Sequence, residues 1–326
     1  MLITNISKII DDILSQNKLI PEVGTDEFFS IAKNRLKRFY VTPCRTEDEK
    51  KIFFKVLIND NPQDRETITS EIKLYQYFSN QNFRSFRTPR IYASGLEPIV
   101  WYNREYIKYG TIADMHFILE KFIEKIETYS QMAAEALIEM SCFLPDKKSD
   151  IGPEPNSYFV NRISEYDTYI SKYLPNFKKD SIRKYKKTLT SFSGDKILVH
   201  GDYHLENLFF KDSGLVIADW ERVHTGNVAE DFSSLWVSLW QVPKNQAEIF
   251  TIFYLKLSED KRKSFDKDIE SMLLVQAAKE FQHWIYCKDI HRNPRYSIEI
   301  VNQGFNYFFQ LLTSLLDGSF KLNEVK

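Results

Sequence analysis

Two patterns of hydrophobic and polar positions alternate along the first third of the chain. Residues 2–16 and 64–81 carry apolar side chains three and four positions apart, which predicts two amphipathic helices. Between and after them lie stretches rich in aromatic and β-branched residues, which are typical of strands. These stretches are 27–43, 51–60, 88–95, 101–110 and 115–124, and a polar turn is expected over 45–50.

From residue 128 onward the pattern becomes helical. Apolar residues recur three and four apart in 129–144, 161–174, 229–256, 264–290 and 302–317. Residues 197–220 interrupt this region with short apolar runs, which predict strands over 207–210 and 215–218 joined by the turn KDSG. We therefore expect an α+β fold with two lobes, a small β-rich lobe over 1–122 and a larger, mainly helical lobe over 123–326.

Composition narrows the possible classes of protein. The 326 residues are 43% hydrophobic and 27% charged, as in an ordinary folded domain, and the net charge of −1 gives no general attraction to nucleic acid or to a membrane surface. No stretch of roughly 20 apolar residues and no signal peptide is evident, so we expect a cytoplasmic location. The three cysteines, Cys44, Cys142 and Cys287, form no C-x-x-C pair, which favours buried free thiols.

Candidate chemistry is concentrated in HGDYHLENLFF, residues 200–210, and in LVIADWE, which follows it. Asp202 comes directly after an apolar strand, Asn207 lies five residues later, and Asp219 ends the next strand at the same end of the predicted hairpin. Two carboxylates and an amide oxygen are hard ligands of the kind that Mg²⁺ prefers when phosphates complete its shell. A carboxylate there can also accept the proton of an attacking hydroxyl, so this grouping predicts phosphoryl transfer.

A cation for the phosphates is suggested by Lys55, which interrupts the apolar strand KIFFKVLI. A lysine buried there is costly unless it is paired. Glu71 follows 16 residues later on the predicted helix and can reach it. Taken alone, these two residues are better explained as a solvent-facing lysine and a solvated glutamate.

Together these segments resemble the aminoglycoside phosphotransferase and choline kinase superfamily, which has the protein-kinase-like fold. HGDYHLEN resembles the family motif H-G-D-x-x-x-x-N, and IADWE resembles its metal-binding I-D-W-E segment. The resemblance implies transfer of the γ-phosphoryl of ATP, with GTP also possible, to a hydroxyl group of a small molecule, with Mg²⁺ as cofactor.

The resemblance also implies a role for each matching residue. Asp202 would be the catalytic base or would position the acceptor hydroxyl, and Asn207 and Asp219 would bind Mg²⁺. Lys55 would contact the α- and β-phosphates and Glu71 would hold it in place.

Further roles implied by the resemblance concern the surroundings of the site. The backbone of Glu120 and Phe122 would bind adenine. His200 would stabilise the loop, and Asp231 would brace it from the start of a helix. Glu221 would support the metal indirectly or remain an exposed acid.

The chain departs from the family pattern at the phosphate-binding loop. No glycine occurs between Gly24 and Gly95, so a glycine-rich loop is absent from the sequence. The matching hairpin is SIAKNRLK, in which Ser30, Lys33 and Asn34 would contact the phosphates. This departure keeps open a catalytically weak nucleotide-binding scaffold as the alternative function.

Other interpretations are less favoured. A plain turn would explain Asp and Asn separately, and a metal site on His200 and His204 lacks helical spacing. A protein kinase would need an A-P-E-like segment and an activation segment between Asp219 and Asp231, and neither is evident in the sequence.

The acceptor itself stays open among aminoglycosides, choline, amino alcohols, sugars and macrolides. Glu280 and Asp289 could receive an amine. Tryptophans in the second half fit either a helical core or a cation pocket; these are Trp220, Trp236, Trp240 and Trp284.

Overall fold

The computed structural model describes residues 3–32, 38–59, 61–107, 123–143, 172–173, 197–211, 214–290 and 296–322. These residues form two compact units. Unit 1 holds the described residues up to 107 together with Phe209–Val223, and unit 2 holds the other described residues from 123 onward. The lobe boundary expected at residue 122 falls outside the described residues and stays a prediction.

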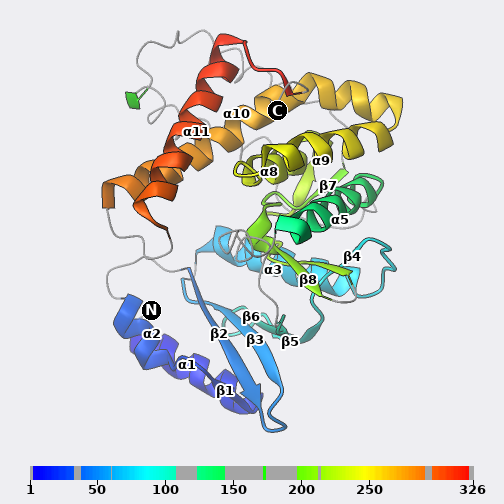
Figure 1. Ribbon diagram of the computed structural model, residues 1–326. Coiled ribbons are helices and arrows are strands. Elements are labelled where there is room, and N and C mark those ends of the chain that lie inside the picture. Colours follow the sequence, from blue (N-terminus) through cyan, green and yellow to red (C-terminus); the bar gives the residue numbers. More distant parts are fainter. Residues whose placement is uncertain are drawn as a thin grey trace. The chain divides into compact units, whose positions relative to one another are not determined.

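Unit 1 is built on a five-stranded antiparallel sheet (Figure 1). Side chains of its central strand alternate between two faces, and Ile52, Phe54 and Val56 are buried in a core shared with α1. The alternation places Lys55 on the opposite face. In order across the sheet, the strands are β1 (Leu19–Pro21), β2 (Phe39–Thr46), β3 (Lys51–Leu57), β6 (Trp101–Glu105) and β5 (Ile91–Gly95).

Two helices precede β2, and the second corrects the sequence analysis. The first predicted helix is confirmed as α1 (Ile3–Gln16), but the strand expected from residue 27 is wrong, because α2 (Thr25–Ala32) lies there. Thr25 begins α2 and its hydroxyl donates to Asp11 of α1 at 2.9 Å. Phe28 packs on the core with its ring 4.9 Å from that of Tyr40. A short apolar run such as FFSIA fits either structure, and packing on α1 selects the helix.

Helix α3 (Pro62–Phe78) confirms the second predicted helix. The Asn61 side chain caps it by accepting a hydrogen bond from the Gln63 backbone N–H at 2.9 Å, and Pro62 suits its first turn. The strands expected over 207–210 and 215–218 are present as β8 (Leu208–Lys211) and β9 (Gly214–Ile217), and β9 also pairs in parallel with β4 (Phe86–Arg87).

Unit 2 is mainly helical. The antiparallel pair β7 (Ile197–Val199) and β10 (His224–Gly226) and the short helix η2 (Leu205–Asn207) interrupt the helices. Trp236 and Trp284 are buried, as expected of core residues, whereas Trp240 is half-buried. Helices of unit 2 whose bounds lie within the described residues are α5 (Ile123–Ser141), α8 (Val228–Ser238), α9 (Pro243–Lys256), α10 (Glu259–Ile290) and α11 (Ile298–Asp317).

Two expectations drawn from composition can be compared with the described residues. No helix among them combines the length and apolar character needed to cross a membrane. All three cysteines are free thiols; Cys44 and Cys287 are buried as expected, but Cys142 is exposed.

Candidate active site

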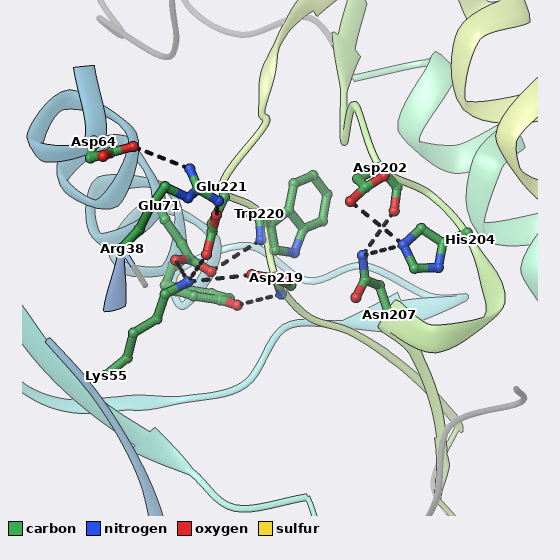
Figure 2. A network of polar contacts seen from close by, with 11 residues as sticks. Arg38, Lys55, Asp64, Glu71, Asp202, His204, Asn207, Asp219, Trp220 and Glu221 are labelled. Carbon is green, nitrogen blue, oxygen red and sulfur yellow. Dashed lines mark hydrogen bonds and ion pairs between the residues drawn. The ribbon is translucent and has the colours of Figure 1, made fainter. Parts of the chain in front are cut away.

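Lys55 is the centre of a charged cluster in unit 1 (Figure 2). Its ammonium group is buried, donates to Glu71 Oε2 at 2.9 Å and lies 3.3 Å from Asp219 Oδ1. Glu221 Oε1 accepts a further hydrogen bond from the same nitrogen. The expected pairing of Lys55 with Glu71 is therefore present in the structure.

Opposing effects set the charges in this cluster. Burial lowers the pKa of Lys55, but the carboxylates, led by that of Glu71, outweigh burial and raise this pKa well above its ordinary value. Burial raises the pKa of Glu71, and the ammonium of Lys55 opposes that rise. Lys55 is thus held as a cation in a position where an unpaired lysine would lose its proton.

Asp219 follows β9 in a strained but tolerated backbone conformation. Its φ is +65°, in the left-handed region that Asp adopts more readily than most residues. Its backbone N–H donates to the Tyr75 hydroxyl at 3.0 Å, and the N–H of Trp220 donates to Glu71 Oε1 at 3.1 Å. Helix α3 thereby fixes the direction of the half-exposed Asp219 carboxylate.

The carboxylates of Glu71, Asp219 and Glu221 lie close enough to act together, with oxygen atoms within 4.8 Å of one another. The Lys55 ammonium balances part of their charge. Carboxylate oxygens are the donors that Mg²⁺ prefers, and the half-exposed Asp219 is accessible from solvent. This donor set fits a hard divalent cation.

Arg38 joins this cluster from the residue before β2. Its Nη1 lies 3.2 Å from Asp64 Oδ1, and its Nη2 lies 2.9 Å from Glu221 Oε2 (Figure 2). Sequence reasoning missed Arg38, because Glu221 is 183 positions away and no spacing relates the two.

In unit 2, Asp231 of α8 braces the loop that follows β7. Its two carboxylate oxygens accept hydrogen bonds from the backbone N–H groups of His200 and Gly201, at 2.7 and 2.9 Å. The buried His200 Nδ1 in turn accepts from the Asp202 N–H at 3.2 Å. Burial, together with the neighbouring Glu230, raises the pKa of Asp231 to about 7, against the effect of the two N–H donors.

The Asp202 side chain has a cationic partner that the sequence did not indicate. Lys279 Nζ of α10 donates to Asp202 Oδ1 at 2.7 Å, and His204 Nε2 lies 3.5 Å from Oδ2. The amide nitrogen of Asn207 donates to the Asp202 carbonyl at 2.9 Å (Figure 2). That bond uses the nitrogen of Asn207, so its amide oxygen is the atom suited to a metal.

A cavity of about 220 Å³ lies beside this loop in unit 2. Lys279 lines it and also contacts Asp202, so the cavity is adjacent to that carboxylate. The expected amine contact Glu280 lines the same cavity, whereas Asp289 lines a different one. Trp240 and Trp284 form part of the wall, and the buried Nε1 of Trp284 has no hydrogen-bond partner among the described residues.

Of the other residues that we expected to contact the nucleotide, only Ser30 lies among the described residues. Ser30 is exposed on helix α2 and does not lie in the hairpin in which we expected it. The expected phosphate contacts Lys33 and Asn34 and the adenine contacts Glu120 and Phe122 lie outside the described residues.

Comparison with known families identifies the chain. A model described as "Phosphotransferase enzyme family" matches residues 39–264. The chain belongs to this phosphotransferase enzyme family. The matched range contains Lys55, the acidic residues around it and the Asp202 loop, and it begins one residue after Arg38. A search of curated proteins found no match.

Solved structures of aminoglycoside phosphotransferases share the fold at low sequence identity, which confirms the expected kinase-like α+β class. The gentamicin complex of APH(2")-IIa is 14% identical with a TM-score of 0.54, covering 97% of each chain. A thermostable APH(4)-Ia mutant with AMP-PNP and hygromycin B is 9% identical with a TM-score of 0.56, covering 87% of this chain and 91% of the other. The GDP complex of aminoglycoside 2'-phosphotransferase-IIIa is 10% identical with a TM-score of 0.55, covering 94% and 97%.

Proposed function

We propose that this phosphotransferase moves the γ-phosphoryl group of ATP, with Mg²⁺, to a hydroxyl group of a small molecule; GTP is the alternative donor. The observation that carries the proposal is the position of Asp202. Its carboxylate lies on a braced loop, is bound by Lys279 and is adjacent to a cavity. A carboxylate held in this way can receive a proton from a hydroxyl group in that cavity.

The nucleotide side of the proposal rests mostly on unit 1. Lys55, fixed by Glu71, would bind the α- and β-phosphates, and Asp219 with Asn207 would bind Mg²⁺. The metal would neutralise charge that develops on the transferring group. Glu221 already contacts Lys55 and would support the metal site.

Catalysis would come mostly from positioning and charge stabilisation. Lys279 would hold the Asp202 carboxylate in place until the acceptor hydroxyl replaces Lys279 as its partner. His200 and Asp231 would act through the loop backbone, which both of them contact.

The walls of the cavity support an acceptor that carries an amine. Trp240 and Trp284 supply aromatic surface, and Glu280 supplies negative charge, which together suit an ammonium group. Aminoglycosides, choline and amino alcohols are the acceptor classes that share this chemistry. The related structures APH(2")-IIa and APH(4)-Ia contain gentamicin and hygromycin B, respectively.

The test is transfer of labelled γ-phosphoryl from Mg-ATP and Mg-GTP to a panel of these acceptors. Asp202→Ala should abolish turnover while the Kd for nucleotide stays nearly unchanged. The matched control Asp48→Ala alters an exposed turn between β2 and β3 and should leave both quantities unchanged. Parent-level turnover by Asp202→Ala would refute the role of Asp202. Tight nucleotide binding by the parent without transfer to any acceptor or to water would instead indicate a nucleotide-binding scaffold.

A further inference from the structure

A chain without a glycine-rich loop needs other donors for the phosphates of a nucleotide. Such loops bind phosphate through backbone N–H groups that only glycine allows to approach closely. Between Gly24 and Gly95 this chain has no glycine, and the described part of the region expected to form the hairpin is helix α2. Side chains at the edge of the sheet are the next source of donors.

The position and the chemistry of Arg38 suit it to binding phosphate. Its guanidinium carries five N–H donors in a planar fork that matches phosphate geometry. Its Nη1 contacts the Asp64 carboxylate, and its Nη2 contacts the Glu221 carboxylate. The Arg38 side chain is 47% exposed, whereas that of Lys55 is 4% exposed, so a ligand from solvent reaches Arg38 readily.

Glu221 couples Arg38 to Lys55. One carboxylate oxygen accepts from Lys55 and the other lies 2.9 Å from Arg38 Nη2, so a single group separates the two cations (Figure 2). The ring of Phe39 also lies between 4 and 5 Å from both, at 4.7 Å from Lys55 Nζ and 4.9 Å from the Arg38 guanidinium carbon. Arg38 and the assigned phosphate-binding lysine are thus parts of one network.

The charges of this network favour the binding of a divalent cation. Four carboxylates, those of Glu71, Asp219, Glu221 and Asp64, face the two cations Lys55 and Arg38. The carboxylates of these contacts outnumber Lys55 and Arg38, and a divalent cation would offset part of their charge. A metal bound at Asp219 and supported by Glu221 would leave both Lys55 and Arg38 able to bind anionic oxygens.

We propose that Arg38 is a second phosphate-binding cation of unit 1, which takes the place of the missing glycine-rich loop. Glu221 holds Arg38 and Lys55 together before nucleotide binds, and a Mg²⁺-nucleotide exchanges these partners for phosphate oxygens. This inference rests on the proposed function. The competing role for Arg38 is structural, as a link between the start of β2 and Asp64 in the first turn of α3.

The test compares a nucleoside triphosphate with its nucleoside. For the parent, Arg38→Gln and Arg38→Lys, the Kd is measured by calorimetry for Mg-ATP or Mg-GTP, whichever the parent binds, and for adenosine or guanosine. Arg38→Gln should weaken triphosphate binding roughly ten- to a hundredfold, as expected for losing charge-assisted hydrogen bonds, and should change nucleoside binding less than twofold. Arg38→Lys should recover part of the loss.

Arg45→Gln is the matched control, because Arg45 lies on β2, the strand that Arg38 precedes, in an exposed pair with Glu49. It should leave both Kd values unchanged. Equal weakening of triphosphate and nucleoside by Arg38→Gln would assign Arg38 the structural role, and unchanged triphosphate binding would also overturn the proposal. A parent that binds neither triphosphate would refute the proposed function itself, which is a different result from either of these.

Discussion

Glu71 is the residue that holds the unit 1 cluster together. It is fully buried, accepts from Lys55 and from the Trp220 N–H, and lies on α3, away from the strand that carries Lys55. A buried charge that loses its partner keeps its desolvation cost, so the two residues depend on each other.

Glu71→Ala should lower the free energy of unfolding by about 3 kcal/mol, near the lower end for breaking a buried ion pair, because Asp219 and Glu221 still contact Lys55. Chemical denaturation measures this loss. Glu66→Ala, an exposed position on the same helix, is the control and should change stability by less than about 0.5 kcal/mol. Equal stability of the two variants would show that the pair contributes little.

Contacts between single residues could be predicted only where the sequence carried a local reason. Lys55 stood out as a charge within an apolar strand, which made a buried partner on the next helix a reasonable expectation. Arg38 and Lys279 lie in ordinary polar surroundings, and their partners are 183 and 77 positions away. Only the folded chain brings such pairs together.

At the scale of elements, helix α8 holds the loop that follows β7. Asp231 of α8 accepts hydrogen bonds from two backbone N–H groups of that loop, one on each carboxylate oxygen. An asparagine there offers one acceptor oxygen, so one buried N–H would lose its partner. Asp231→Asn should therefore cost about 1–3 kcal/mol of stability.

The cost of Asp231→Asn should also depend on pH. The folded-state pKa of Asp231, about 7, lies above the ordinary 3.8, so the folded protein binds this proton more tightly than the unfolded chain does. The contribution of this bound proton to the stability of the folded protein is complete below about pH 4 and is lost as the pH rises through 7. Between pH 5.5 and 8 the stability advantage of the parent over Asp231→Asn should fall by about 2 kcal/mol. Denaturation at both pH values measures it, and an advantage that grows with pH would contradict the raised pKa.

The contact between α10 and α11 depends on Gly304. A Cβ at this position would lie 2.5 Å from ring atoms of Trp284. Alanine normally favours a helix by about 1 kcal/mol over glycine, but here overpacking costs about 1–3 kcal/mol. Gly304→Ala should therefore destabilise the protein in thermal unfolding. Gly24→Ala is the control, because a Cβ there would meet no described atom within 4 Å; a Gly304→Ala variant as stable as this control would show that the interface readily adjusts.

Helices and strands were predictable where the apolar period was long. Helix α3 keeps its apolar period over four turns, and Ile68, Ile72, Tyr75 and Phe78 on this period are all buried. Helix α2 was missed because eight residues are too few to distinguish the apolar period of a helix from that of a strand. Its conformation depends on α1 and Tyr40, which lie elsewhere in the chain.

At the scale of the whole molecule, the proposed reaction divides its groups between the two units. Unit 1 supplies Lys55, Glu71 and Asp219, and unit 2 supplies Asp202 and Asn207. The fold class could be predicted, because the change from mixed to helical patterning is visible along the chain. The set of residues that make up unit 1 could not be predicted, because Phe209–Val223 joins this unit through the long-range pairing of β9 with β4.

The most direct test is thermal unfolding of the parent and of Asp219→Ala, each without nucleotide, with Mg-ATP and with Mg-GTP. A ligand that binds only the folded state stabilises it by about 2.7 kcal/mol at 100 times its Kd. We expect the parent's midpoint to rise with at least one nucleotide and the rise to shrink in Asp219→Ala, each protein being compared with its own nucleotide-free midpoint. No rise in the parent with either nucleotide would contradict a metal-nucleotide site on the Lys55 cluster, and with it the proposed phosphotransfer.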